Sequence, residues 1–118
     1  MTALLVALGS ALGGVCRYGV FRLLNGSGGF PWGPFSVNVL GSLAIGCLCG
    51  ILSRWTGHAS AVRSFAVVGF CGGFTTFSTF SNEAVRLMES AQWGLFLLYV
   101  LGSVAAGIAA VWLGLKLG

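Results

Sequence analysis

Four long apolar stretches dominate this sequence and restrict what it can fold into. A helix needs about 20 mainly apolar residues to cross the hydrocarbon core of a bilayer, and the stretches between charged residues reach that length four times. We predict transmembrane helices over about Thr2–Leu24, Phe35–Ser53, Ala61–Met88 and Gln92–Lys116. Charged residues make up only 7% of the 118 residues, too few to cover a water-soluble domain of this size. The sequence therefore predicts an all-α membrane protein with one four-helix domain, residues 1–118.

The positive charges are spread almost evenly over the two ends of the predicted helices. Four helices place both termini and the middle loop on one side of the membrane. The cations near that side are Arg54, Arg63 and Lys116, and those near the other side are Arg22, Arg86 and Arg17. Because the Lys and Arg bias of the loops sets orientation, this chain has no strong reason to insert one way. Four short helices also make too thin a bundle to shield a polar pathway, so we predict a homodimer of chains that insert in both orientations, with oppositely inserted subunits as one possible pairing.

The third predicted helix contains an unusual segment. Gly72 and Gly73 lower its helix propensity twice in succession, and Thr75–Ser81 is a polar and aromatic run where a lipid-facing helix should be aliphatic. Non-helical backbone at membrane depth is tolerated only inside protein or along a cavity, where its freed carbonyls can hold a cation. We therefore predict a break near Gly72–Thr76 and a candidate ion site there, with a kinked but intact packing helix as the alternative.

Two stripes of side chains lie next to each other after the break. Phe77 and Phe80 are three residues apart and share a helix face, while Thr76, Thr79 and Glu83 form a neighbouring stripe. The edge of an aromatic ring is electropositive, so edge-on phenylalanines can contact a dehydrated anion without a full charge. The pattern indicates an anion pathway, and ordinary core packing of the two phenylalanines is the alternative.

A few polar residues in or near the apolar stretches are further candidates. Asn38 lies deep in the second stretch, where its amide needs a partner; it would either donate to an anion or hold two helices together. Ionisable groups in membrane segments are functional candidates by default. Glu83 is predicted to pair with a cation, and Arg17 to reach headgroups or draw anions, unless both simply lie at the interface. His58 is predicted to be a solvated loop residue.

No set of residues supports an enzyme. The chain has one histidine, two acidic residues and no glycine-rich loop followed by lysine, which excludes the common hydrolytic, redox and nucleotide-binding sites. The four cysteines lie inside apolar stretches, so neither a disulfide framework nor a zinc site is implied. We predict that the protein is not an enzyme.

The run Gly69–Glu83, GFCGGFTTFSTFSNE, resembles the signature of the Fluc (CrcB-type) fluoride channels. Three more matches follow the family's order: Gly13–Tyr18, Trp32–Asn38, and the pair Gly41-Ser42. The resemblance covers the whole chain and implies a fluoride-selective channel for passive fluoride export, giving resistance to environmental fluoride. It also implies the plasma (inner) membrane of a bacterium, an antiparallel homodimer with two pores, and a structural sodium ion at the dimer centre.

The resemblance also assigns roles to individual residues. The side chains that would form the fluoride pore offer aromatic edges, hydroxyls or an amide: Asn38, Phe77, Ser78, Thr79, Phe80, Tyr99 and Ser103. Tyr99 and Ser103, on the fourth helix, are the weaker candidates. The backbone carbonyls of Gly72 and Thr75 would hold the sodium ion.

Two other functions compete with this interpretation. A small multidrug-resistance transporter has the same size and topology, but its proton exchange needs a carboxylate within the membrane. The first predicted helix has no acid, and Glu83 is the one carboxylate that could serve. A structural membrane subunit without a pore would explain the apolar helices but not the run of hydroxyls and aromatic rings.

Overall fold

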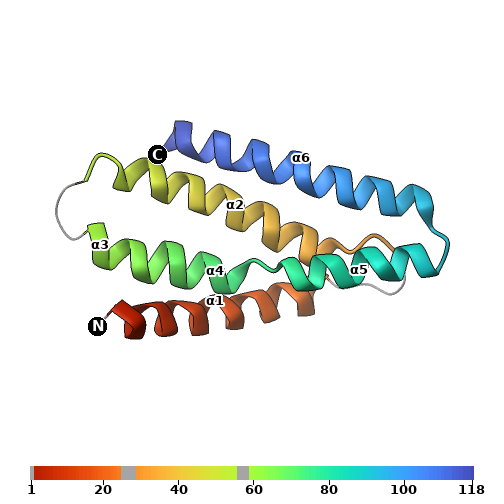
Figure 1. Cartoon of the computed structure of the whole chain (residues 1–118), viewed down its shortest axis with the longest axis horizontal. Helices are drawn as coiled ribbons and strands as arrows, with labels where there is room; N and C mark the ends of the chain where they lie inside the picture. Colours follow the sequence, from red (N-terminus) through yellow and green to blue (C-terminus); the bar gives the residue numbers. More distant parts are fainter. Residues whose placement is uncertain (1, 25–28, 56–58) are drawn as a thin grey trace.

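The computed structural model describes residues 2–24, 29–55 and 59–118, and all regular structure within them is helical. In chain order the elements are α1 (Thr2–Leu24), α2 (Trp32–Leu52), α3 (Ala59–Val62), the π-helix η1 (Arg63–Cys71), α4 (Gly72–Phe74), α5 (Phe77–Glu89) and α6 (Trp93–Leu117). They form an elongated bundle, 51 Å along its longest axis, with both termini at one end (Figure 1). The all-helical prediction is confirmed, and the largest error in a helix limit is at α2, which begins at Trp32 rather than Phe35. His58 lies outside the described residues.

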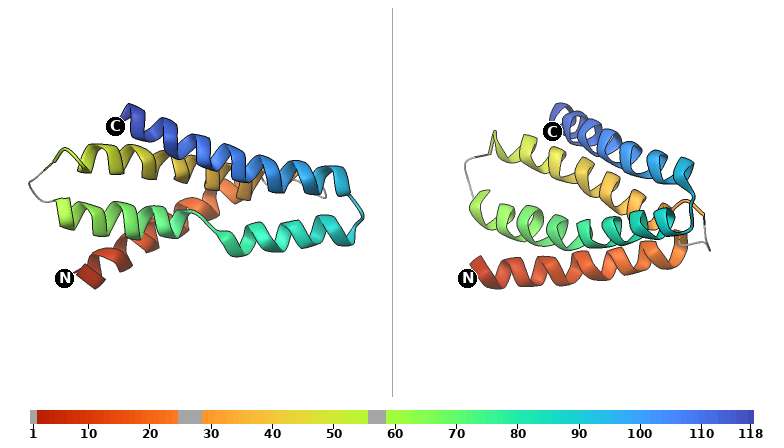
Figure 2. Two further views of the ribbon diagram at one scale, coloured as in Figure 1. Left: turned by 45° about the horizontal axis from the view of Figure 1, so that its top comes forward. Right: turned by 45° about the vertical axis from the view of Figure 1, so that its right-hand side comes forward.

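Three helices, α1, α2 and α6, are each long and apolar enough to cross a membrane. The remaining run, from Ala59 to Glu89, is divided between Phe74 and Phe77 into two shorter parts. We call Ala59–Phe74 the first half and α5 the second half of the broken helix. The two halves point roughly along the bundle axis with an offset between them (Figure 2). The four-span arrangement and the dimer stay predictions.

The first half packs on α1 at backbone distance. A Cβ atom added to Gly69 would lie 2.9 Å from the Val6 carbonyl oxygen, and one added to Gly13 would lie 2.8 Å from the Phe74 nitrogen. Both distances are shorter than real side chains allow, so this approach requires glycine. Small residues at helix contacts of this kind are the usual packing device in membranes. Tight packing of α1 therefore fixes the first half up to the break.

A second glycine contact joins α2 to α6. Gly46 and Gly114 are both buried, and a Cβ on Gly114 would lie 2.7 Å from the Cys47 nitrogen. The two helices contact each other along much of their length and form a pair beside the broken helix. Neither helix of this pair is interrupted, so the break is confined to one layer of the bundle (Figure 1).

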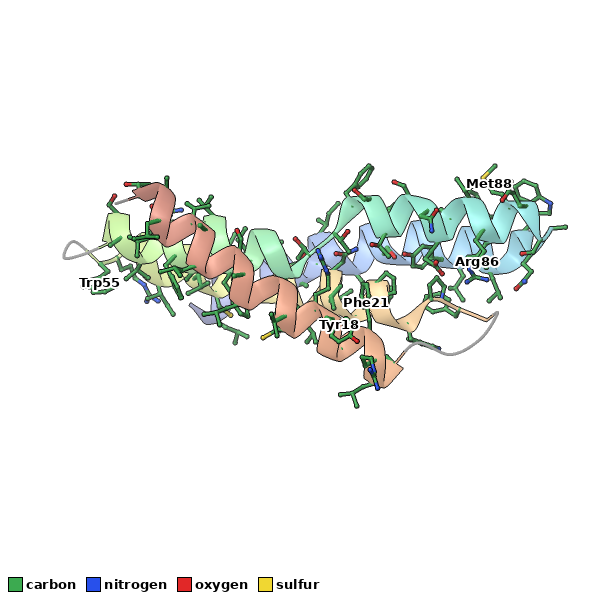
Figure 3. The ribbon with its side chains drawn as sticks, turned by 90° about the horizontal axis from the view of Figure 1, so that it is seen from below. Tyr18, Phe21, Trp55, Arg86 and Met88 are labelled. Carbon is green, nitrogen blue, oxygen red and sulfur yellow. The ribbon has the colours of Figure 1, made fainter. Side chains whose placement is uncertain are left out.

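The second half packs on α6 through large side chains rather than glycines. Leu87 and Tyr99 are fully buried, with Ala84 beside them. Side chains packed around this core are Phe30, Phe35, Phe80, Leu95, Phe96 and Val100. Figure 3 shows α5 with Arg86 and Met88 at the end of the bundle opposite Trp55. An aromatic cluster therefore fixes α5, while backbone contact fixes the first half.

Candidate functional site

The helix break lies at two threonines. Thr75 (φ −83°, ψ 159°) and Thr76 (φ −152°, ψ 118°) are extended, whereas Gly72 and Gly73 remain helical. The interruption agrees with the predicted segment, but the glycines are not the residues that leave the helix. β-branched threonines are well suited to extended backbone, and their hydroxyls can replace helix hydrogen bonds.

Asn38 holds the extended backbone in place. Its Nδ2 donates to the Thr76 carbonyl at 3.1 Å, and its Oδ1 accepts from the Thr76 N–H at 2.8 Å. One amide side chain on α2 therefore satisfies both backbone groups of Thr76, 38 residues away. The sequence left two roles open for Asn38, and in the structure it links α2 to the broken helix. The second Nδ2 hydrogen is still available as a donor.

Some of the last backbone carbonyls of the first half accept hydrogen bonds and others do not. Thr75 donates both its N–H (3.0 Å) and its Oγ1 (2.9 Å) to the Cys71 carbonyl. Arg17 Nη1 donates to the Gly73 carbonyl at 3.1 Å. In a continuous helix the N–H of residue 76 would bond to the carbonyl of Gly72, but here that N–H bonds to Asn38. The Gly72 carbonyl therefore loses its helical donor.

The second half begins with a hydroxyl cap. Thr76 Oγ1 accepts from the Thr79 N–H at 3.2 Å and donates to Thr79 Oγ1 at 3.3 Å. A threonine in this position satisfies one of the free N–H groups of a helix start. The cap sets the direction in which α5 presents its first turn, which carries Phe77 and Ser78.

The aromatic rings at the start of α5 form a row towards α6. Phe77 is 78% exposed, its ring centroid is 5.8 Å from that of Phe80, and Phe80 is 5.1 Å from Tyr99. The row runs from the surface of the chain at Phe77 into its interior at Tyr99, which is fully buried. Ser78 lies on the exposed side of the same turn. The predicted aromatic contacts are therefore brought together with one of the predicted residues of α6.

Two hydroxyls beside this row have no partner. Tyr99 and Ser103 each have a buried side-chain oxygen without a hydrogen bond among the described residues. They are four residues apart, so both oxygens belong to one face of α6. Leaving a buried hydroxyl unpaired costs about 1–3 kcal/mol, so this face of α6 is suited to accept a polar ligand.

An open groove of about 530 Å³ lies beside the break. It is lined by residues of α2, η1, α4, the break and the start of α5: Asn38, Gly41, Ser42, Ile45, Val67, Val68, Cys71, Gly72, Thr75, Thr76 and Phe77. Four predicted site residues, Asn38, Gly72, Thr75 and Phe77, thus meet at one surface. Phe80, Tyr99 and Ser103 are not among the residues that line this groove.

The charged candidates have protein partners. Glu83 Oε1 pairs with Arg86 Nε at 3.0 Å, and Arg86 Nη2 also donates to the Gly29 carbonyl at 3.0 Å. The predicted pairing of Glu83 with a cation is confirmed. Arg17 bonds to Gly73 rather than extending to the bundle end, a contact that the sequence interpretation did not anticipate.

Comparison with known proteins agrees with these features. Residues 4–115 match the family described as CrcB-like protein, Camphor Resistance (CrcB). The chain belongs to the CrcB family. A relative from Agrobacterium fabrum, named a fluoride-specific ion channel, is 46% identical over 116 residues, covering 97% of this chain and 93% of the relative.

Other CrcB relatives carry the same name. That from Methylobacterium nodulans is 49% identical over 112 residues (94% of this chain, 90% of the relative), and that from Thermus thermophilus is 46% identical over 117 residues (98% and 93%). Since CrcB relatives are named ion channels, the prediction that this chain is not an enzyme is confirmed. The family and the long apolar helices together identify a multi-pass membrane protein.

Proposed function

We propose that this protein is a fluoride-selective channel for passive export through the bacterial plasma membrane, giving resistance to environmental fluoride. The observation that carries the proposal is a pair of buried hydroxyls, Tyr99 and Ser103, which have no hydrogen-bond partner among the described residues and lie on the α6 face next to Phe80. Relatives named fluoride-specific ion channels support the choice of ion.

Fluoride binds water tightly, so a pore must replace that water with other donors. Hydroxyls of Ser78, Thr79, Tyr99 and Ser103 would donate hydrogen bonds, and the edges of Phe77 and Phe80 would contact the ion where hydroxyls are absent. The second Nδ2 hydrogen of Asn38 would add an amide donor at the groove. A row of weak neutral contacts lets the ion leave as readily as it enters, which suits rapid passage.

The two helix ends at the break have opposite partial charges. The last carbonyls of the first half form the negative end of one helix dipole, and the first N–H groups of α5 form the positive end of another. The positive end belongs to the turn that carries Phe77, Ser78 and Thr79. An anion is therefore favoured on the α5 side of the break and a cation on the α4 side.

A structural sodium ion fits the α4 side. Half-helix ends and unwound carbonyls are the usual sodium ligands in broken membrane helices. The Gly72 carbonyl has lost its helical donor to Asn38, and Gly72 and Thr75 both line the groove. We assign their carbonyls to the ion, which would hold two copies of the break together without being transported.

A second copy of the chain supplies the cover that this groove needs. Extended backbone at membrane depth cannot face lipid, yet the groove beside Thr75 and Thr76 is open, and Phe77 and Val68 next to it are largely exposed. The nearly equal cation content of the two bundle ends favours an antiparallel pair inserted in both orientations. Such a dimer carries two equivalent α5–α6 pathways and hence two pores.

Fluoride efflux from liposomes tests the proposal. Purified protein is reconstituted with potassium fluoride inside, valinomycin is added to release the counter-charge, and a fluoride electrode records the efflux; matched vesicles contain potassium chloride. We expect rapid fluoride efflux with chloride retained. Folded dimers that release no fluoride, or release both anions equally, would overturn the proposal.

A further inference from the structure

Arg17 lies where a charge is costly. It is the first charged residue of α1 after 15 uncharged ones, and its guanidinium reaches across to the first half of the broken helix, 56 residues away in sequence. Charged groups inside membrane segments are expensive and are retained for a specific partner. The partner here is the Gly73 carbonyl, in the last turn before the break.

The break leaves several backbone carbonyls without helical donors. Because Thr75 and Thr76 are extended, the carbonyls of Gly72, Gly73 and Phe74 lack the donors that a continuous helix would provide. Arg17 occupies the Gly73 carbonyl and Asn38 occupies the Thr76 carbonyl. Arg17 and Asn38 do not bind the carbonyls of Gly72 and Thr75, and these two residues line the groove.

We infer that Arg17 is a positioning residue that fixes the Gly73 carbonyl and thereby determines which carbonyls of the break face the proposed sodium ion. This inference rests on the sodium site of the proposed function. The guanidinium is always charged and its donors have a rigid planar geometry, so it holds a carbonyl more firmly than a rotating ammonium. A cation at a helix C-terminus also stabilises that end of the first half.

The same helix offers two matched controls. Ser10 Oγ donates to the Gly69 carbonyl at 3.3 Å, so Ser10→Ala removes a hydrogen bond between α1 and the first half that lies one turn before Gly73. Arg22 contacts Tyr18 at the end of α1, so Arg22→Gln removes an equal charge without touching the break.

The sodium dependence of the melting temperature tests the inference. Purified dimers are heated at increasing sodium concentration, with choline chloride keeping the ionic strength constant. Ligands that bind only the folded state raise its stability. We expect Arg17→Ala to raise the half-maximal sodium concentration about tenfold or more, Arg17→Lys to raise it less, and both controls to stay within about twofold of wild type.

A wild-type sodium response in Arg17→Ala would overturn the inference. If that variant forms no folded dimer, Arg17→Gln is judged by the same criterion. A wild-type protein without any sodium response would overturn both the sodium site and the role of Arg17. Fluoride efflux from the wild-type protein would still be measured separately, so failure of the channel proposal is distinguishable from failure of this inference.

Discussion

The two halves of the broken helix are built in different ways. The first half, Ala59–Phe74, contacts α1 at backbone distance through glycines and ends in carbonyls, one of which Arg17 binds. The second half, α5, contacts α6 through Phe80 and other large side chains and begins with a threonine cap. A single interruption therefore creates two electrostatic environments: the carbonyl end of the first half suits a cation, and the N-terminal end of α5 suits an anion.

The largest expected effect is in the aromatic row of the second half. Phe77→Ile or Phe80→Ile removes the ring edge but keeps an apolar side chain of moderate size. We expect each to reduce fluoride efflux about 100-fold or more, equal to about 2.7 kcal/mol of barrier, while the dimer remains folded. Phe70→Ile is the control, since Phe70 stacks on Phe74 in the first half, and its efflux should stay close to wild type. An equal loss of fluoride efflux in all three variants would contradict a specific role for the aromatic rings of the second half.

The join between the halves should be the next most sensitive position. Asn38→Leu keeps the volume but leaves the N–H and carbonyl of Thr76 without their partner, each at a cost of about 1–3 kcal/mol. We expect lower resistance to thermal unfolding together with reduced efflux. Ser42→Ala, one turn further along α2 in the same groove, should unfold like wild type. Unchanged stability of Asn38→Leu would show that the two hydrogen bonds do not hold the break.

Removing the unpaired hydroxyls of α6 should separate transport from stability. Tyr99→Phe or Ser103→Ala deletes a buried oxygen that has no partner in the described part of the chain, so the melting temperature should stay constant or rise. Fluoride efflux should fall about tenfold, or about 1.4 kcal/mol of barrier. Tyr18→Phe, which alters an exposed hydroxyl on α1, should change neither. A lower melting temperature with unchanged efflux would assign these oxygens a purely structural role.

The smallest effect is expected at the far end of the second half. Glu83→Gln breaks the pair with Arg86, whose side chain is 35% exposed against 24% for Glu83, and exposed pairs contribute about 0–1 kcal/mol. Fluoride efflux should remain within about threefold of wild type and should not depend on a proton gradient. Loss of transport together with proton dependence in the wild type would instead favour the exchanger.

The sequence was sufficient for the helices and for the position of the break. Apolar length predicted the helical runs, and the glycines and threonines between Gly72 and Thr76 predicted the interruption. Helix propensity pointed to the two glycines within this range, but Gly72 and Gly73 stay helical while Thr75 and Thr76 are extended. Contacts with Asn38, far away in sequence, decide this point, and no local pattern contains them.

The sequence predicted the candidate site less completely. Phe77 and Phe80 could be paired by their spacing, but the contact of Phe80 with Tyr99 depends on how α5 packs on α6. The contact of Arg17 with the Gly73 carbonyl was missed although a signal was present: Gly9, Gly13 and Arg17 follow each other at four-residue spacing and share the face that packs on the broken helix.

The reversal potential of the purified protein in a planar bilayer tests the central claim most directly. Both chambers contain sodium fluoride and sodium chloride, and the fluoride and chloride gradients are varied in turn while an impermeant sodium salt keeps the sodium concentration constant. The account predicts a current whose reversal potential follows the fluoride gradient and does not respond to chloride or to pH. A reversal potential that follows chloride or protons would contradict a fluoride-selective path along α5 and α6.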